Sequence, residues 1–152
     1  MQMGNSESIN TANFDDVRMS KGCSLIHVMD ECEQNVMIKG TLSIEDEIDV
    51  INDILSKQMQ QESVIIIYGK NTDAVPKLVK RYRQLRGLGF TNTFVYFGGL
   101  FEWLLLQDIY GISEFPIENL KNLKIDPMQY KPYGKLYFAN MDCPHLQCKN
   151  VY

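Results

Sequence analysis

Hydrophobic and polar positions along residues 23–107 form patterns typical of strands and helices in turn. Apolar runs with the character of buried strands lie at 23–29, 64–68 and 93–96. Apolar residues recur at helical spacing over 43–60, 74–86 and 100–107. This alternation predicts an α/β fold in which a parallel central sheet carries helices on both faces.

The expected helix from Ser43 to about Gln60 has the clearest start. Ser43, with Asp46 three residues on, is a capping-box pattern, and the acids at 45–47 suit the positive end of a helix dipole. Its apolar stripe is expected to face the core and consists of Ile44, Ile48, Ile51 and Leu55. The helix over 74–86 has a similar stripe, made of Leu78, Val79, Tyr82 and Leu85.

The two ends of the chain differ in pattern from the middle. Residues 1–13 are poor in apolar side chains and are expected to form a flexible lead-in to a single domain over 14–115. Residues 116–152 are rich in tyrosine and proline and show no sustained period, so they are expected to form an aromatic C-terminal extension. Short strands are candidates at 41–42 and 136–139.

Composition and charge narrow the function classes. A chain of 152 residues with 45% hydrophobic residues can bury the core of one domain. A net charge of −4 argues against a general nucleic-acid binder, and no apolar run approaches the roughly 18 residues of a membrane span. Four cysteines without a secretory signal favour an intracellular location, cytoplasmic by default, with an organelle or a viral particle also open. Nothing in the sequence calls for a cofactor.

One stretch resembles a known family. The segment GLGFTNTFVYFGGLFEWLL, at 87–105, is similar to the rhodanese homology domain, with its Leu-Gly-Phe helix end, short strand, Gly-Gly turn and following helix. The run VIIIYG at 64–69 occupies the place of the strand that enters the family's active loop. The resemblance implies a single rhodanese-like domain, a module of sulfurtransferases and of some dual-specificity phosphatases.

The resemblance also implies that the active loop is degenerate. In active sulfurtransferases a cysteine follows the strand, and its thiolate carries the transferred sulfur as a persulfide. The matching position here is Gly69, which has no side chain to replace that sulfur. The degenerate loop consists of Gly69, Lys70, Asn71, Thr72, Asp73 and Ala74. We therefore expect a catalytically inactive protein that acts as a protein-binding or structural subunit of a larger intracellular assembly.

Two features are candidate contacts for a protein partner. The helix segment KLVKRYRQLR carries cations, among them Lys77, Lys80 and Arg81, that form either a docking face or a solvated outer face. In the extension, Tyr133 and Tyr137 are either interface anchors or part of a tail that wraps its own domain.

Several residues leave other functions open. His27, in a predicted core strand, is either a hydrogen-bonded structural histidine or a catalytic base. Cys143, His145 and Cys148 look like half of a zinc site, or are a tail with free thiols. Cys143 or Cys148 as a substitute nucleophile would make the protein an active sulfurtransferase. The loop at 69–71 also retains backbone N–H groups that suit a small anion without reaction.

Overall fold

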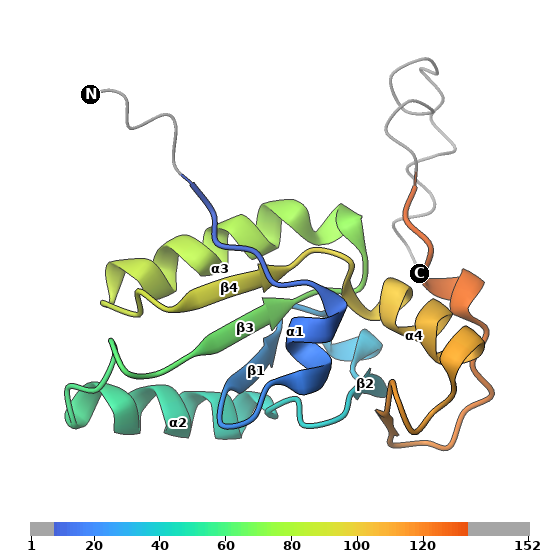
Figure 1. Ribbon diagram of the computed structural model, residues 1–152, viewed down its shortest axis with the longest axis horizontal. Helices are drawn as coiled ribbons and strands as arrows, with labels where there is room; N and C mark the ends of the chain where they lie inside the picture. The colour runs from blue at the N-terminus through green and yellow to red at the C-terminus, as the bar shows by residue number, and fades with distance from the viewer. Residues whose placement is uncertain (1–7, 134–152) are drawn as a thin grey trace, which may run out of the picture.

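The computed structural model describes residues 8–133. Its helices and strands follow the predicted alternation, with additions at both ends of the domain (Figure 1). The strands are β1 (Ser24–His27), β2 (Val36–Ile38), β3 (Ile65–Tyr68), β4 (Thr93–Tyr96) and β5 (Ile117–Asn119). The helices are α1 (Phe14–Met19), α2 (Ile44–Ser56), α3 (Val75–Gly87) and α4 (Gly99–Tyr110), with 3₁₀ turns η1 (Glu31–Glu33), η2 (Thr72–Ala74) and η3 (Pro127–Tyr130).

The central sheet is parallel and has the strand order β1-β3-β4. Its register places His27, Tyr68 and Tyr96 side by side at the carboxyl ends of the three strands. Because parallel strands end at the same edge, the loops that follow meet there, and Gly69 lies at the end of the middle strand. The predicted parallel sheet is confirmed.

Helices cover both faces of this sheet. On one face, α2 and α3 pack over Ile65 and Ile67 of β3 through residues such as Ile51, Leu78 and Tyr82. On the other face, α4 buries Leu100 and Trp103 in a second apolar cluster, to which α1 also contributes. In Figure 1 the three strands run side by side, with α3 drawn along the β4 side of the sheet and α2 along the β1 side. No helix within residues 8–133 has the length and apolar character needed to cross a bilayer.

The apolar stripe predicted for α2 is wrong in its first half. Ile51 is buried and Leu55 half-buried, but Ile44 and Ile48 are 47% and 53% exposed. The helix packs on the sheet by its second half, through Ile51, Ile54 and Leu55, so its first turns have no apolar surface to cover. It also ends at Ser56 instead of near residue 60, because Gln58 adopts a left-handed conformation with φ 54°.

The residues just before α1, which belong to the expected lead-in, are bonded to the central sheet. Asn10 accepts a hydrogen bond from Val95 N–H at 2.9 Å, and Ala12 N–H donates to the Val95 carbonyl at 3.0 Å. These bonds add a short parallel pairing to the outer edge of β4. The sequence could not predict this pairing, because it involves a single residue pair and no alternation of apolar and polar residues accompanies it.

The start of the predicted extension belongs to the domain. β5 pairs antiparallel with β2, although neither was expected as a strand. Trp103 Nε1 donates to the Pro116 carbonyl at 3.0 Å, and the Trp103 ring meets Phe115 edge-on with centroids 5.0 Å apart. The boundary at 115/116 therefore cuts through a packed region. The candidate strand at 41–42 is reduced to one bridge between Thr41 and Leu25, and 136–139 lies outside the described residues.

Candidate functional site

The loop at residues 69–74 connects the middle strand of the sheet to α3. Its first half turns toward α4, because the carbonyls of Gly69 and Lys70 accept hydrogen bonds from Leu100 N–H at 3.0 Å and Phe101 N–H at 2.9 Å. Its second half folds on itself, since the Asn71 side chain accepts from Asp73 N–H at 2.8 Å and the Asn71 carbonyl accepts from Ala74 N–H at 3.1 Å. The N–H groups at 73 and 74 are thus bonded within the loop.

Position 69, which the resemblance pairs with the family's cysteine, has no room for a side chain. A Cβ atom at Gly69 would lie 2.5 Å from the Cβ of Ala74 and 3.3 Å from Cγ2 of Val28. Carbon atoms at van der Waals contact are about 3.5–4.0 Å apart, so the first of these contacts is a clash. Ala74 therefore occupies the space that a cysteine at position 69 would need.

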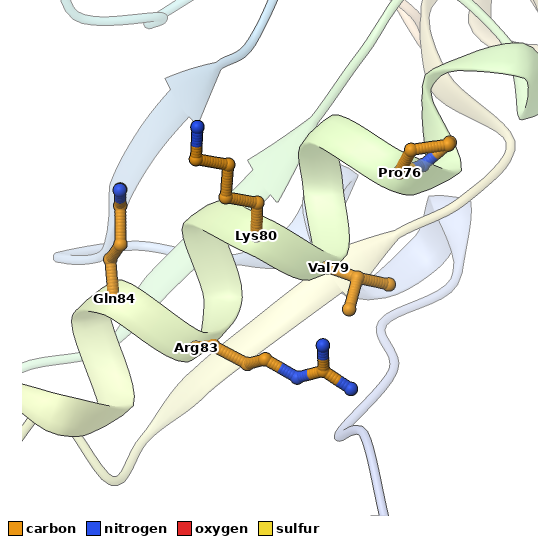
Figure 2. Close-up of a pocket in the computed structure, with 5 residues that line it drawn as sticks. All are labelled: Pro76, Val79, Lys80, Arg83 and Gln84. Atoms are coloured by element: carbon orange, nitrogen blue, oxygen red, sulfur yellow. The ribbon is translucent and has the colours of Figure 1, made fainter.

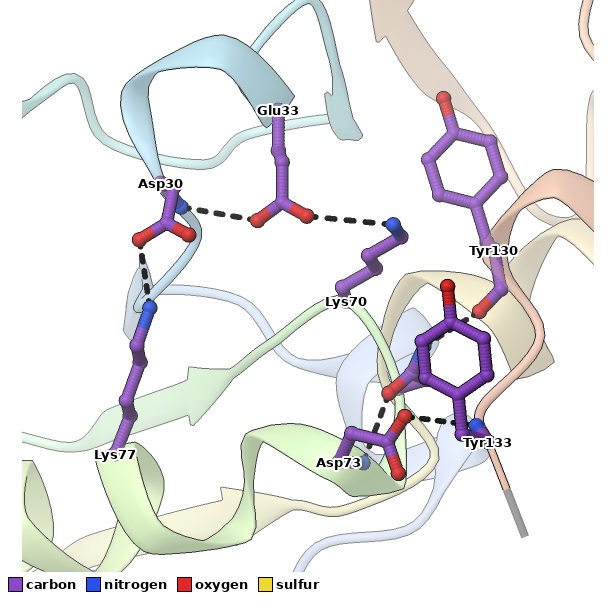
Figure 3. A network of polar contacts seen from close by, with 8 residues as sticks. Asp30, Glu33, Lys70, Asp73, Lys77, Tyr130 and Tyr133 are labelled. Atoms are coloured by element: carbon purple, nitrogen blue, oxygen red, sulfur yellow. Dashed lines mark hydrogen bonds and ion pairs between the residues drawn. The ribbon is translucent and has the colours of Figure 1, made fainter. Parts of the chain in front are cut away.

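Two ion pairs line the same edge of the sheet. Lys70 Nζ lies 3.3 Å from Glu33 Oε2, and Lys77 Nζ lies 2.6 Å from Asp30 Oδ1 (Figure 3). Both acids come from the loop after β1, within or just before η1. Each lysine beside the loop therefore has a carboxylate partner, which reduces the positive field available to an anion.

The chain's own C-terminal segment crosses this loop. Asn71 Nδ2 donates to the Tyr130 carbonyl at 2.7 Å, and Tyr133 N–H donates to Asp73 Oδ2 at 2.8 Å (Figure 3). Lys70 Nζ also lies 5.8 Å from the centre of the Tyr130 ring, a cation–π distance. Burial, with a smaller contribution from nearby Glu33, raises the pKa of the Tyr130 phenol. We call residues 126–133 the strap.

A cleft of about 1040 Å³ lies between the loop and the strap. Its walls combine the η1 region, the loop and the first turn of α3 with the strap residues Met128, Gln129, Lys131 and Tyr133. Sequence reasoning placed Lys77 and Tyr133 in two separate binding surfaces, whereas the structure brings both to this one cleft. It did not find Asp30 or Glu33, because their contacts with Lys77 and Lys70 span 47 and 37 residues and carry no local signal.

The basic face of α3 is largely engaged within the domain. Besides the Lys77–Asp30 pair, Arg81 Nη2 lies 2.6 Å from Glu47 Oε2 on α2. Burial raises the pKa of Glu47, and the Arg81 charge and hydrogen bond lower it in part. Lys80 stands with Pro76, Val79, Arg83 and Gln84 around an open hollow on the outer side of α3 (Figure 2). Of the three candidate cations, Lys77 and Arg81 are thus paired with carboxylates of the same domain.

His27 is a buried residue below the same sheet edge. Its Nδ1 accepts from Met29 N–H at 3.0 Å, while Nε2 has no hydrogen-bond partner among residues 8–133. Burial lowers the pKa of the imidazole, so the neutral form is favoured. The expected hydrogen-bonded structural histidine agrees with the Nδ1 contact.

The remaining candidates fall outside the described residues or find no support within them. Tyr137, Cys143, His145 and Cys148 lie outside residues 8–133. Within that range no group of three or more histidine, cysteine, aspartate or glutamate side chains is placed to hold a metal ion.

Known proteins resemble this chain in structure more than in sequence. No family model and no curated protein matches it. The solved Alr3790 protein of Anabaena sp. is 18% identical and superposes with a TM-score of 0.50, over 78% of this chain and 97% of that one. The structure of the Rhodanese_3 like domain from that protein is 24% identical with a TM-score of 0.43, over 63% of this chain and 98% of that one. The fold is that of a rhodanese-like domain.

A larger enzyme also matches over part of its length. The anaerobic ergothioneine biosynthesis enzyme from Chlorobium limicola, solved with its natural substrate trimethyl histidine, is 19% identical with a TM-score of 0.40. The match covers 59% of this chain and 24% of that one, so this chain matches only about a quarter of the enzyme. The rhodanese-like fold that the sequence predicted is confirmed, and the likeness at these identities concerns the fold alone.

Proposed function

We propose that this protein is a catalytically inactive rhodanese-like module that binds another protein as part of a larger assembly. The observation that carries the inactivity is the end of β3, where Gly69 stands in place of a nucleophile and Ala74 fills the space of its Cβ. Sulfur transfer of the family's kind needs a thiolate at this point, stabilised by free N–H groups. Here the loop supplies no sulfur, and its N–H groups at 73 and 74 are already bonded.

Support for a binding role comes from apolar side chains that the domain leaves exposed. Ile44 and Ile48 form a ridge on α2, one helical turn apart, and Ile109, Tyr110 and Ile112 are exposed around the end of α4. Apolar groups clustered on an exposed surface are typical of protein contacts. The earlier candidates Lys77 and Arg81 are less suited, because each is paired with a carboxylate of its own domain.

A sulfur-transfer assay tests the catalytic half of this proposal. The full-length protein is incubated with thiosulfate and cyanide, and thiocyanate is measured against an active rhodanese as reference. We expect no turnover above the protein-free blank. Cysteine-dependent turnover, abolished by Cys143→Ser or Cys148→Ser, would contradict inactivity and favour the substitute-nucleophile alternative.

The binding half is tested on the α2 ridge. The wild-type protein and an Ile44→Asp/Ile48→Asp variant are used as bait in extracts of the cells that contain the protein. Asn52→Asp, an exposed position on the same helix, is the matched control for added charge. We expect the control to retain a specific partner and the double variant to lose it. Equal capture by all three proteins would remove the ridge as the contact, and no specific capture by any of them would count against a binding module.

A further inference from the structure

The contacts between the loop and the strap have a common form. On the loop side they come from two side chains, those of Asn71 and Asp73, and on the strap side from main-chain groups, the Tyr130 carbonyl and the Tyr133 N–H. Asn71 is only 5% exposed, and its amide orientation is set because Oδ1 already accepts from Asp73 N–H. Nδ2 is therefore left to donate to a carbonyl, and the Asp73 carboxylate is left to accept from an N–H.

Asn71 and Asp73 together thus bind a backbone carbonyl and the backbone N–H three residues further along the chain. Neither hydrogen bond involves a strap side chain, so the recognition does not depend on residue type at either position. Main-chain hydrogen bonds of this kind provide affinity in many peptide-binding sites, and side-chain pockets add the specificity. Here the half-buried Tyr130 ring, which packs against the apolar cluster of α4, is the side-chain anchor.

The strap lies outside the two β-sheets of the described residues. In the described part of the chain no β-ladder joins it to the domain, and Met128 is 52% exposed. A segment that no β-ladder joins to the domain opens more readily than the strands of the core do. The cleft beside it gives a second extended segment room to bind. Its lysines at 70 and 77 each face a carboxylate, so the net charge of an incoming peptide is a minor factor.

We propose that Asn71 and Asp73 form a binding site for an extended peptide, and that the chain's own strap is its resident occupant. The degenerate loop has in this way become a clamp for peptide backbone in place of a cradle for an anion. This inference goes beyond the proposed function, since it holds whether or not the protein transfers sulfur.

Amide exchange in the full-length protein tests the clamp. Asp73→Ala removes the acceptor for Tyr133 N–H, whereas Asp73→Asn retains an acceptor oxygen and is the matched control. We expect Asp73→Ala to speed exchange of the Tyr133 amide by about three- to tenfold, the size of one lost hydrogen bond, and Asp73→Asn to leave it near the wild-type rate. Asn71→Asp keeps the bond to Asp73 N–H but sets an acceptor against the Tyr130 carbonyl, so it too should free the strap. Wild-type exchange in both Asp73→Ala and Asn71→Asp would overturn the clamp.

A competing peptide tests whether Asn71 and Asp73 bind a peptide that is not part of the same chain. A capped synthetic peptide with the sequence of residues 126–133 is added at about millimolar concentration, comparable to the effective concentration of a tethered segment. We expect resonances of Gly69–Ala74 to shift and the Tyr133 amide of the protein to exchange faster. The same peptide N-methylated at its last tyrosine lacks the N–H donor and should do neither. Equal effects of both peptides, or none from either, would refute a site that reads peptide backbone.

Discussion

Replacing Gly69 by cysteine is expected to destabilise the protein and not to turn it into a sulfurtransferase. The new Cβ would lie 2.5 Å from the Cβ of Ala74, about 1 Å or more inside the normal contact distance. Neither atom is the flexible end of a long side chain, so the backbone of the loop or of η2 must move. Overpacking of this kind costs about 1–3 kcal/mol in the free energy of unfolding.

The second substitution Ala74→Gly removes the atom that clashes and gives a double-mutant cycle. Alone, Ala74→Gly should cost about 0.5–1 kcal/mol through added flexibility of the unfolded chain. Combined with Gly69→Cys, it should recover about 1 kcal/mol or more relative to the sum of the single changes. Urea unfolding of the four proteins measures these free energies, with equal m-values as the condition for comparison. If Gly69→Cys unfolds at the wild-type midpoint with the wild-type m-value, the steric account of this loop is wrong.

Three further predictions concern the support of the loop. Gly99→Ala should lower the free energy of unfolding by about 2 kcal/mol or more, because φ is +66° and the new Cβ would lie 2.5 Å from the Gly69 carbonyl oxygen. Gly87→Ala is the control, since its Cβ would have no atom within 4 Å, and it should be neutral or stabilising in the same urea titration. Tyr68→Phe should lower the free energy of unfolding by about 1–3 kcal/mol, because it removes the hydroxyl that lies 3.1 Å from the buried N–H of Ile38 and leaves that N–H without an acceptor. An unchanged unfolding midpoint would contradict this. Because the pKa of His27 is lowered, the unfolded chain binds a proton more readily than the folded one. The contribution of His27 to stability should be full well above the ordinary pKa of 6.5 and be lost as the pH falls through 6.5 towards 5.5. His27→Gln should remove that loss, and an unaltered pH dependence in the variant would exclude His27 as its source.

The elements that could be predicted are those with a strong local pattern. The apolar runs that became β3 and β4 were found within one residue, because burial on a sheet face imposes a pattern that any local window contains. Three of the four residues predicted for the α3 stripe are buried, whereas Val79 lines the hollow on the outer side of the helix. The pairing of β2 with β5 was missed, since three-residue strands that lie about 80 residues apart have no such periodicity. Ile44 and Ile48 were predicted to be buried because they follow helical spacing, but both are exposed, since no other part of the described domain covers that side of α2.

The sequence by itself determined what the loop lacks, because a glycine at position 69 carries no sulfur in any conformation. It also determined the strand and helix between which that loop lies. Only the tertiary structure decided what the loop does instead. Ala74 closes the vacated space, and Asn71 and Asp73 hold backbone groups of Tyr130 and Tyr133 about 60 residues away. Such contacts depend on where the whole fold brings distant segments together. The strap contributes only main-chain groups to them, and because almost every residue type carries the same main-chain groups, no pattern in the sequence indicates the pairing.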